Sequence, residues 1–184
     1  MIPAKTRLTL ADYDALPESS QITELIDGEI VVNPPVDPHQ MILGNIYFAL
    51  RSRMPSGHWR LAPTGLRPDE DSSLEPDLFW VSPQNTRCVL EASGRYWHGA
   101  PDLVVEILSP STEMNDRGAK FAIYERAGVR EYWMVNPDAQ FVEVFVLDAD
   151  AGRYIRQGLI GMDGAFTSAL IGGQPIEIAE WFRS

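Results

Sequence analysis

A carboxylate interrupts an otherwise apolar run, LVVEIL at residues 103–108, and this arrangement restricts the folds open to the chain. Side chains alternate between the two faces of a strand, so Val104, Glu106 and Leu108 share one face and the other face is apolar throughout. Strands that are apolar on both faces are typical of the buried part of a sheet. An unpaired buried carboxylate costs several kcal/mol, so Glu106 needs a cation, a hydrogen-bond donor or a metal beside it. The alternative is an edge strand with Glu106 in water.

This run begins a β-α-β unit. A helix is predicted from near Glu113 to Ala127, closed by Gly128, and the strand-like REYWMV follows at 130–135. Earlier in the chain, apolar residues at helical spacing predict a helix over about 38–54. The short β-like segments HWRLA, TGLR and DLFWV come next and suggest an antiparallel meander. A polar, glycine-containing loop is expected between DLFWV and LVVEIL.

Both ends of the chain add to this core. Thr9 is predicted to cap a short helix over LADYDAL, and Asp37 to cap the helix over 38–54. ITELI and EIVV flank Asp27-Gly28, the pair that a type I′ turn prefers, and therefore predict a β-hairpin. The tail, from FVEVFVL to IEIAEWF, predicts further strands and a closing turn. We expect one α/β (α+β) domain over residues 1–184, with a mixed sheet.

Composition supports a folded protein. With 184 residues, 45% of them apolar, the chain is long enough to bury a core without disulfides. Its longest apolar runs are too short to span a membrane, and the lone Cys88 fits a reducing compartment, so we expect a cytoplasmic protein. The formal net charge of -11 argues against nucleic-acid binding, although a sum over the surface cannot locate a patch.

Asp77 opens a second apolar strand, PDLFWV, on the face that carries Phe79 and Val81. Pro-Asp is also a common turn dipeptide, so Asp77 taken alone could be a turn residue without a functional role. Its expected place one strand away from Glu106 favours a functional role.

Lys120 lies on the predicted helix after LVVEIL, on one face with Asp116, Ile123 and Tyr124. If this face is turned toward the sheet, the flexible stem can bring the ammonium group to the strand that bears Glu106. The alternative is a surface ion pair between Asp116 and Lys120.

Two carboxylates and a lysine suit phosphodiester hydrolysis. Mg²⁺ binds one or two carboxylates while keeping water, lowers the pKa of that water and screens the phosphate. The ammonium group then stabilises the negative charge that develops in the transition state.

Several strings of the sequence together resemble one family. ELIDGEIVV at 24–32, PDLFWVSP at 76–83, PDLVVEILSPST at 101–112 and GVREYWMVNP at 128–137 are similar to the Uma-two family of restriction-endonuclease-like proteins, in the PD-(D/E)XK superfamily. The resemblance covers nearly the whole chain. It implies a core of order α-β-β-β-α-β, with Asp77 and Glu106 as ligands of Mg²⁺ or Mn²⁺ and Lys120 as the catalytic lysine.

One position departs from the superfamily. Its third motif has a lysine two residues after the glutamate, where this chain has Leu108, so Lys120 resembles a migrated replacement. Glu24 is similar to the additional acidic residue that some superfamily members supply from an N-terminal element.

Other chemically active side chains have weaker patterns. His39, His58 and His98 lack zinc-ligand spacing, and nothing supports a nucleophilic pair of Cys88 and His98, so surface or structural roles are expected. Asp102 is expected to cap its strand, and the acidic run at 69–71 to be a solvated turn.

Three functions remain open. The first is a metal-dependent endonuclease acting on DNA, possible as a homodimer because the strand-rich tail has edges that can pair. The second is a nuclease-fold binding or regulatory module without turnover, in which Lys120 would point away from the carboxylates. The third is another hydrolase with an acidic pair, such as a glycosidase, which gives Lys120 no role.

Overall fold

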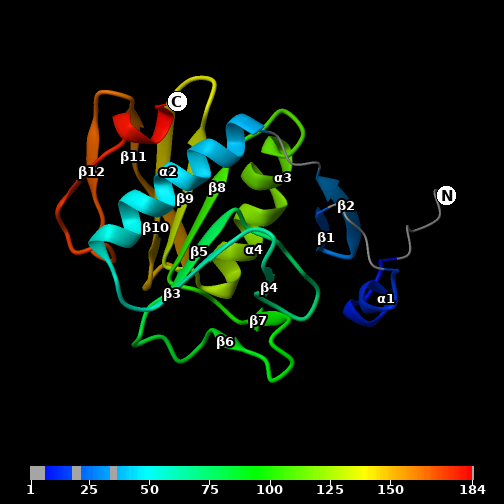
Figure 1. Ribbon diagram of the computed structural model, residues 1–184. Helices are drawn as coiled ribbons and strands as arrows, with labels where there is room; N and C mark the ends of the chain where they lie inside the picture. The colour runs from blue at the N-terminus through cyan, green and yellow to red at the C-terminus, as the bar shows by residue number, and fades with distance from the viewer. Residues whose placement is uncertain (1–6, 18–21, 34–36, 184) are drawn as a thin grey trace.

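The computed structural model describes residues 7–17, 22–33 and 37–183. A six-stranded sheet forms its centre, in the order β11-β10-β9-β8-β5-β3 (Figure 1). Its strands are β3 His58–Leu61, β5 Leu78–Val81, β8 Leu103–Ile107, β9 Glu131–Asn136, β10 Phe141–Asp148 and β11 Arg153–Gly161. β8 pairs parallel with β9 and the other neighbours pair antiparallel, so the mixed sheet is confirmed.

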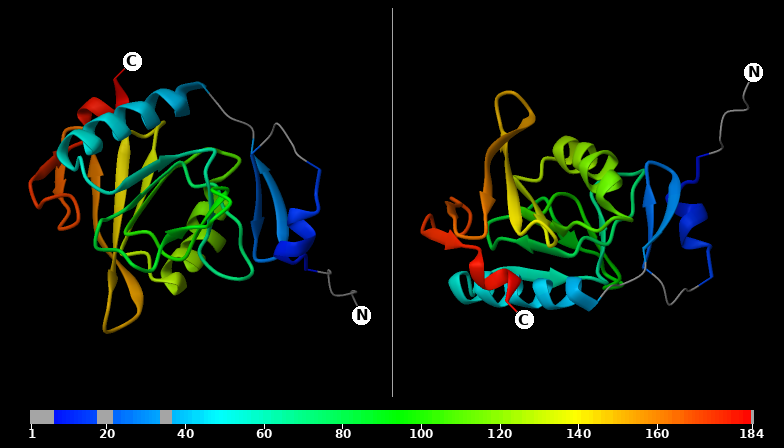
Figure 2. Two further views of the ribbon diagram at one scale, coloured as in Figure 1. Left: turned by 60° about the horizontal axis from the view of Figure 1, so that its bottom comes forward. Right: turned by 90° about the horizontal axis from the view of Figure 1, so that it is seen from above.

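Helices cover both faces of this sheet, as the view from above in Figure 2 shows. α2, Asp37–Arg53, covers one face with the buried side chains of Ile46 and Leu50. α3, Glu113–Arg117, and α4, Ala119–Ala127, lie on the opposite face. The order α2-β3-β5-β8-α4-β9 is the α-β-β-β-α-β core that the sequence predicts.

The alternation along β8 is also confirmed. Val105 and Ile107 belong to the core under α2, whereas Val104 and Leu108 belong to the core under α4. Glu106 shares the second face, because residues two apart in a strand point the same way. Its side chain is therefore directed toward α4.

The N-terminal hairpin is present as predicted, from β1, Ile22–Ile26, to β2, Glu29–Asn33. Asp27 and Gly28 have φ angles of 47° and 80°, the positive values that a type I′ turn requires. Leu25 exchanges two backbone hydrogen bonds with Ser73, at 2.8 and 2.9 Å. These bonds attach the hairpin to the loop before β5.

The first helix, α1, spans Leu10–Asp14 and starts with the predicted Thr9 cap. Thr9 and Asp12 form a capping box, in which each side chain bonds the other residue's backbone N–H. The predicted cap on α2 involves the side chain of Asp37, which lies outside the described side chains, and α2 begins at that residue.

The predicted meander is wrong in its middle strand, which belongs to a separate three-stranded sheet. The strands of this small sheet are β4 Gly65–Arg67, β6 Val89–Leu90 and β7 Tyr96–His98. β6 and β7 occupy the expected polar loop, where the buried rings of Tyr96 and Trp97 supply an apolar face. Gly65 permits the pairing of β4 with β7, because a Cβ there would collide with the Tyr96 ring.

The predicted helix from Glu113 to Ala127 is divided in two. Gly118 separates α3 from α4 with φ −111° and ψ −96°, outside the helical region. A Cβ at this position would lie 2.8 Å from the Met114 carbonyl oxygen, so glycine suits the break. α4 ends at Gly128 in the left-handed conformation, as predicted.

The C-terminal tail completes the molecule with β12, Ala165–Thr167, β13, Pro175–Glu177, and a 3₁₀ turn, Ala179–Phe182. β12 and β13 form an antiparallel pair, and Trp181 of the turn is fully buried in the core under α2. No helix in the described ranges combines the length and the apolarity needed to cross a membrane.

Candidate active site

Glu106 lies in the middle of the large sheet with 3% of its surface exposed. β8 is flanked by β5 and β9, so the edge-strand alternative is wrong. Oε1 of Glu106 accepts hydrogen bonds from Lys120 Nζ at 3.2 Å and from the Tyr124 hydroxyl at 2.9 Å. The buried carboxylate thus has the cationic partner that its position requires.

Asp77 directly precedes β5, and the antiparallel register that pairs Leu78 with Val105 brings Asp77 beside Glu106. Its backbone N–H donates to Glu106 Oε2 at 3.3 Å. Its Oδ2 accepts from the backbone N–H of Ile107 at 2.7 Å. Two neighbouring strands therefore fix the two carboxylates next to each other.

His39, in the first turn of α2, contacts the remaining oxygen of Asp77. The distance from His39 Nε2 to Asp77 Oδ1 is 2.7 Å, and the side chains are 17% and 14% exposed. Burial lowers the pKa of His39, but the hydrogen bond and charge of Asp77 outweigh it, so the pKa is raised overall. A surface or structural role was expected for His39, and the structure places it against a predicted site residue.

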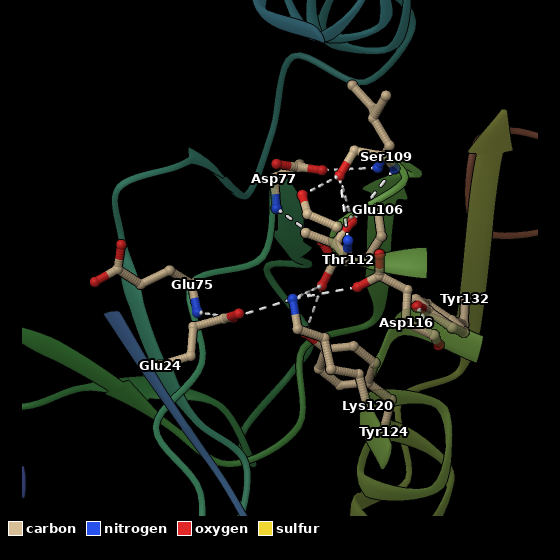
Figure 3. A network of polar contacts seen from close by, with 12 residues as sticks. Glu24, Glu75, Asp77, Glu106, Ser109, Thr112, Asp116, Lys120, Tyr124 and Tyr132 are labelled. Atoms are coloured by element: carbon tan, nitrogen blue, oxygen red, sulfur yellow. Dashed lines mark hydrogen bonds and ion pairs between the residues drawn. The ribbon is translucent and has the colours of Figure 1, made fainter. Parts of the chain in front are cut away.

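Lys120 lies among three carboxylates from different elements (Figure 3). Its Nζ is 3.1 Å from Glu24 Oε1 on β1, 3.2 Å from Glu106 Oε1 on β8 and 3.3 Å from Asp116 Oδ1 on α3. The side chain is 4% exposed, so the surface-pair alternative is wrong. Burial lowers the pKa of Lys120, but these carboxylates raise it well above its ordinary value.

The carboxylates of the cluster are electrostatically linked. Burial raises the pKa of Glu106 well above its ordinary value, and the ammonium of Lys120 opposes this shift. The charges of Asp116, Asp77 and Glu24 raise it further. Burial also raises the pKa of Asp116, whose Oδ1 makes no hydrogen bond although Lys120 is near. An added cation would favour the charged forms of these groups.

Glu75 adds another acidic group at the border of the cluster. Its backbone N–H donates to Glu24 Oε1 at 2.8 Å, while its side chain points away from Lys120 in Figure 3. Burial, followed by the charge of Glu24, raises the pKa of Glu75 to about 7.

The cluster thus brings together Asp77, Glu106, Lys120 and Glu24, which the sequence singles out, although Lys120 contacts Glu106 and not Asp77. Asp116 and Tyr124 were noted only as residues on the Lys120 face, and their four-residue spacing from Lys120 is the signal for them. No local pattern distinguishes His39.

The other candidates lie in local contacts of their own. His98 pairs with Glu91 at 3.1 Å, and the Cys88 thiol is buried, which raises its pKa to about 12. Asp102 accepts from the backbone N–H of Ser82 at 2.8 Å, a structural contact at the strand end.

Asp77 and Glu106 offer the hard oxygen donors that Mg²⁺ and Mn²⁺ prefer. Within residues 7–17, 22–33 and 37–183, no group of three or more His, Cys, Asp or Glu side chains is arranged to hold a metal ion. Mg²⁺ commonly uses only one or two protein carboxylates and completes its shell with water and substrate oxygens. The two adjoining carboxylates of Asp77 and Glu106 are compatible with that number of protein ligands.

Comparison with known proteins identifies a family and a shared fold. The model of the Uma2 family, described as "Putative restriction endonuclease", matches residues 10–171. The structure is similar to the crystal structure of a putative nuclease belonging to DUF820 from Anabaena variabilis ATCC 29413, with a TM-score of 0.77 and 21% identity. The match covers 95% of this chain and 97% of that chain, and at this identity it shows a common fold. No curated protein matches the chain.

Proposed function

The chain belongs to the Uma2 family of putative restriction endonucleases, and we propose that it is a metal-dependent endonuclease that hydrolyses phosphodiester bonds in DNA. The observation that carries this proposal is the meeting of Asp77, Glu106 and Lys120 on one face of the sheet. Two adjoining carboxylates and an ammonium group are the parts that such a reaction uses.

Asp77 and Glu106 would hold Mg²⁺ or Mn²⁺ through carboxylate oxygens. When bound, the ion would lower the pKa of water and offset the charge of the phosphate. Asp77 is suited to this role because the Ile107 N–H holds Oδ2 and His39 contacts Oδ1. Ligands fixed in this way need little rearrangement on binding.

Lys120 would supply the positive charge that stabilises the developing negative charge of the phosphate. Three carboxylates surround its ammonium group, and Asp116 Oδ1 is the one that makes no hydrogen bond. A phosphate oxygen would therefore replace Asp116 most easily. Glu24 would act as the additional acidic residue that keeps Lys120 in position.

The net charge of -11 is compatible with this role. Among the described residues, five acidic side chains lie in or beside the cluster, where a divalent cation would offset part of their charge. These residues are Glu24, Glu75, Asp77, Glu106 and Asp116.

A nuclease-fold binding or regulatory module without turnover is the second candidate. Leu108 at the usual lysine position and the close enclosure of Lys120 by carboxylates favour it. The expectation that Lys120 would then point away from the carboxylates is wrong, because Nζ contacts Glu106.

Cleavage of supercoiled plasmid DNA in Mg²⁺ or Mn²⁺ separates the two functions. The wild type should cut, and Asp77→Asn and Glu106→Gln should abolish cutting while circular dichroism shows a native fold. Glu70→Gln, in the exposed acidic turn, is the matched control and should cut like the wild type. Absence of cutting by the wild type on DNA or RNA would favour the binding module. If both site variants cut DNA as fast as the wild type, the activity would come from a contaminant, and the assigned site would be contradicted.

A further inference from the structure

The face of the large sheet under α2, opposite the candidate active site, carries a cavity. A cavity of about 560 Å³ lies beside β10, β11 and β12, at the end of the molecule away from the β1–β2 hairpin (Figure 1). Apolar side chains form much of its wall, namely Val144, Val146, Ile160 and Phe166. The exposed Gln157 and Thr167 border it.

Glu131, the first residue of β9, also lines this cavity and is 3% exposed. Its Oε1 accepts from the Ser168 hydroxyl at 2.8 Å, and its Oε2 accepts from the indole N–H of Trp133 at 3.0 Å. Both donors are neutral. In the described part of the chain no lysine, arginine or histidine forms an ion pair with Glu131, and neighbouring Arg130 instead reaches Asp102 at 3.2 Å.

Glu131 has no ion-pair partner at contact distance among the described residues, and burial raises its pKa overall, although the hydrogen bonds of Ser168, Trp133 and the Leu170 N–H and the charge of Arg130 act in the opposite direction. A carboxylate can accept about four hydrogen bonds, so an acceptor position remains beside the donors from Ser168, Trp133 and Leu170. A ligand with a cationic head would therefore compensate the charge, while the apolar wall would cover a hydrocarbon body.

We propose that this cavity binds a small organic ammonium ion, with the ammonium group on Glu131 and an aliphatic or aromatic body against Val146 and Phe166. Trp133 belongs to the core under α2, and Glu131, two residues earlier in β9, shares its face. Glu106 lies between Val104 and Leu108 on the face under α4. Occupation of this site is thus separate from the proposed nuclease site. The cleavage experiment and the ligand-binding experiment can therefore succeed or fail independently of each other.

The Trp133 indole N–H, which donates to Glu131, provides a direct reporter. Benzylammonium added to ¹⁵N-labelled protein should shift this signal and the amides of Gly158 and Thr167 in a saturable manner. Benzyl alcohol is the neutral control. Its affinity should be lower than that of benzylammonium by about tenfold or more, because it lacks the charge-assisted hydrogen bond. Glu131→Gln keeps an acceptor for the indole and should lose about tenfold in benzylammonium affinity.

A second variant keeps the test decisive if Glu131→Gln does not fold. Ala165→Phe, at an exposed position of the cavity wall, should fill the space and abolish the shifts while Glu131 stays intact. No saturable shift in the wild type, or equal affinity for the amine and the alcohol, would overturn the proposal. A Trp133 shift that depends on protein concentration alone would assign the cavity to a second copy of the chain and would also overturn it.

Discussion

The backbone N–H of Asp77 donates a hydrogen bond to Oε2 of Glu106 at 3.3 Å, so the two acidic residues lie side by side across β5 and β8. Asp77 is fixed in turn through Oδ2 by the Ile107 N–H, and Glu106 through Oε1 by Lys120 and Tyr124. The substitutions Asp77→Asn and Glu106→Gln remove the charge of each carboxyl group and keep nearly its size.

Replacement of Lys120 by methionine should lower the free energy of unfolding by about 3–5 kcal/mol at neutral pH. The loss is expected because Glu106 and Asp116 would remain buried without their shared cation. Urea unfolding measures it. The double variant Lys120→Met with Glu106→Gln should lose less than Lys120→Met alone, and a loss below about 1 kcal/mol in the single variant would argue against a charge-balancing lysine.

Removal of the His39 side chain should weaken Mn²⁺ binding by about tenfold, because partners that orient a metal ligand contribute on that scale. His39→Ala is compared with His58→Ala, an exposed histidine on β3. Calorimetric titration with Mn²⁺ measures the affinity. If His39→Ala and His58→Ala bind Mn²⁺ with equal affinity, the contact between His39 and Asp77 does not contribute to metal binding.

Two buried tyrosines allow a matched comparison. The Tyr124 hydroxyl donates to the carboxylate of Glu106 at 2.9 Å, whereas the Tyr132 hydroxyl donates to the backbone carbonyl of Asp116 at 3.0 Å. Tyr124→Phe should therefore lower both stability, by about 1.5–3 kcal/mol, and Mn²⁺ affinity. Tyr132→Phe should lower stability alone, so an equal effect of both variants on Mn²⁺ affinity would count against the assigned role of Tyr124.

Asp102 should contribute to stability above about pH 4 and lose this contribution in acid. Burial raises its pKa, but hydrogen bonds from Ser82 and Asn85 outweigh that effect and lower the pKa overall. A lowered pKa in the folded state stabilises the protein above the unfolded pKa, and the effect disappears as pH falls through the folded pKa. Asp102→Asn should flatten the decline of the urea midpoint below pH 3.8, the ordinary pKa of this carboxyl. Asp163→Asn, in an exposed turn, should leave that decline unchanged, and identical profiles for wild type and Asp102→Asn would contradict the prediction.

Much of the core could be predicted because its signals are local. The period of two around Glu106, the Asp27-Gly28 turn and the Thr9 cap each depend on neighbouring residues. The grouping of Asp116 with Lys120 was also predictable, since their four-residue spacing persists across the break at Gly118, but the sequence left open whether this face turns toward the sheet.

The remaining features depend on contacts between distant segments. β4 leaves the large sheet because Tyr96, 31 positions after Gly65, offers it a partner. The same holds for His39, whose contact with Asp77 joins the start of α2 to the start of β5. A single sequence contains no local pattern for such pairings.

Mn²⁺ binding followed by electron paramagnetic resonance tests whether Asp77 and Glu106 form a metal site. The wild type and Glu70→Gln should bind Mn²⁺ saturably and equally. Asp77→Asn and Glu106→Gln should each weaken binding by about tenfold or more, because each removes a charged ligand. Saturable binding that both variants retain undiminished, or no saturable binding by the wild type, would contradict the assignment.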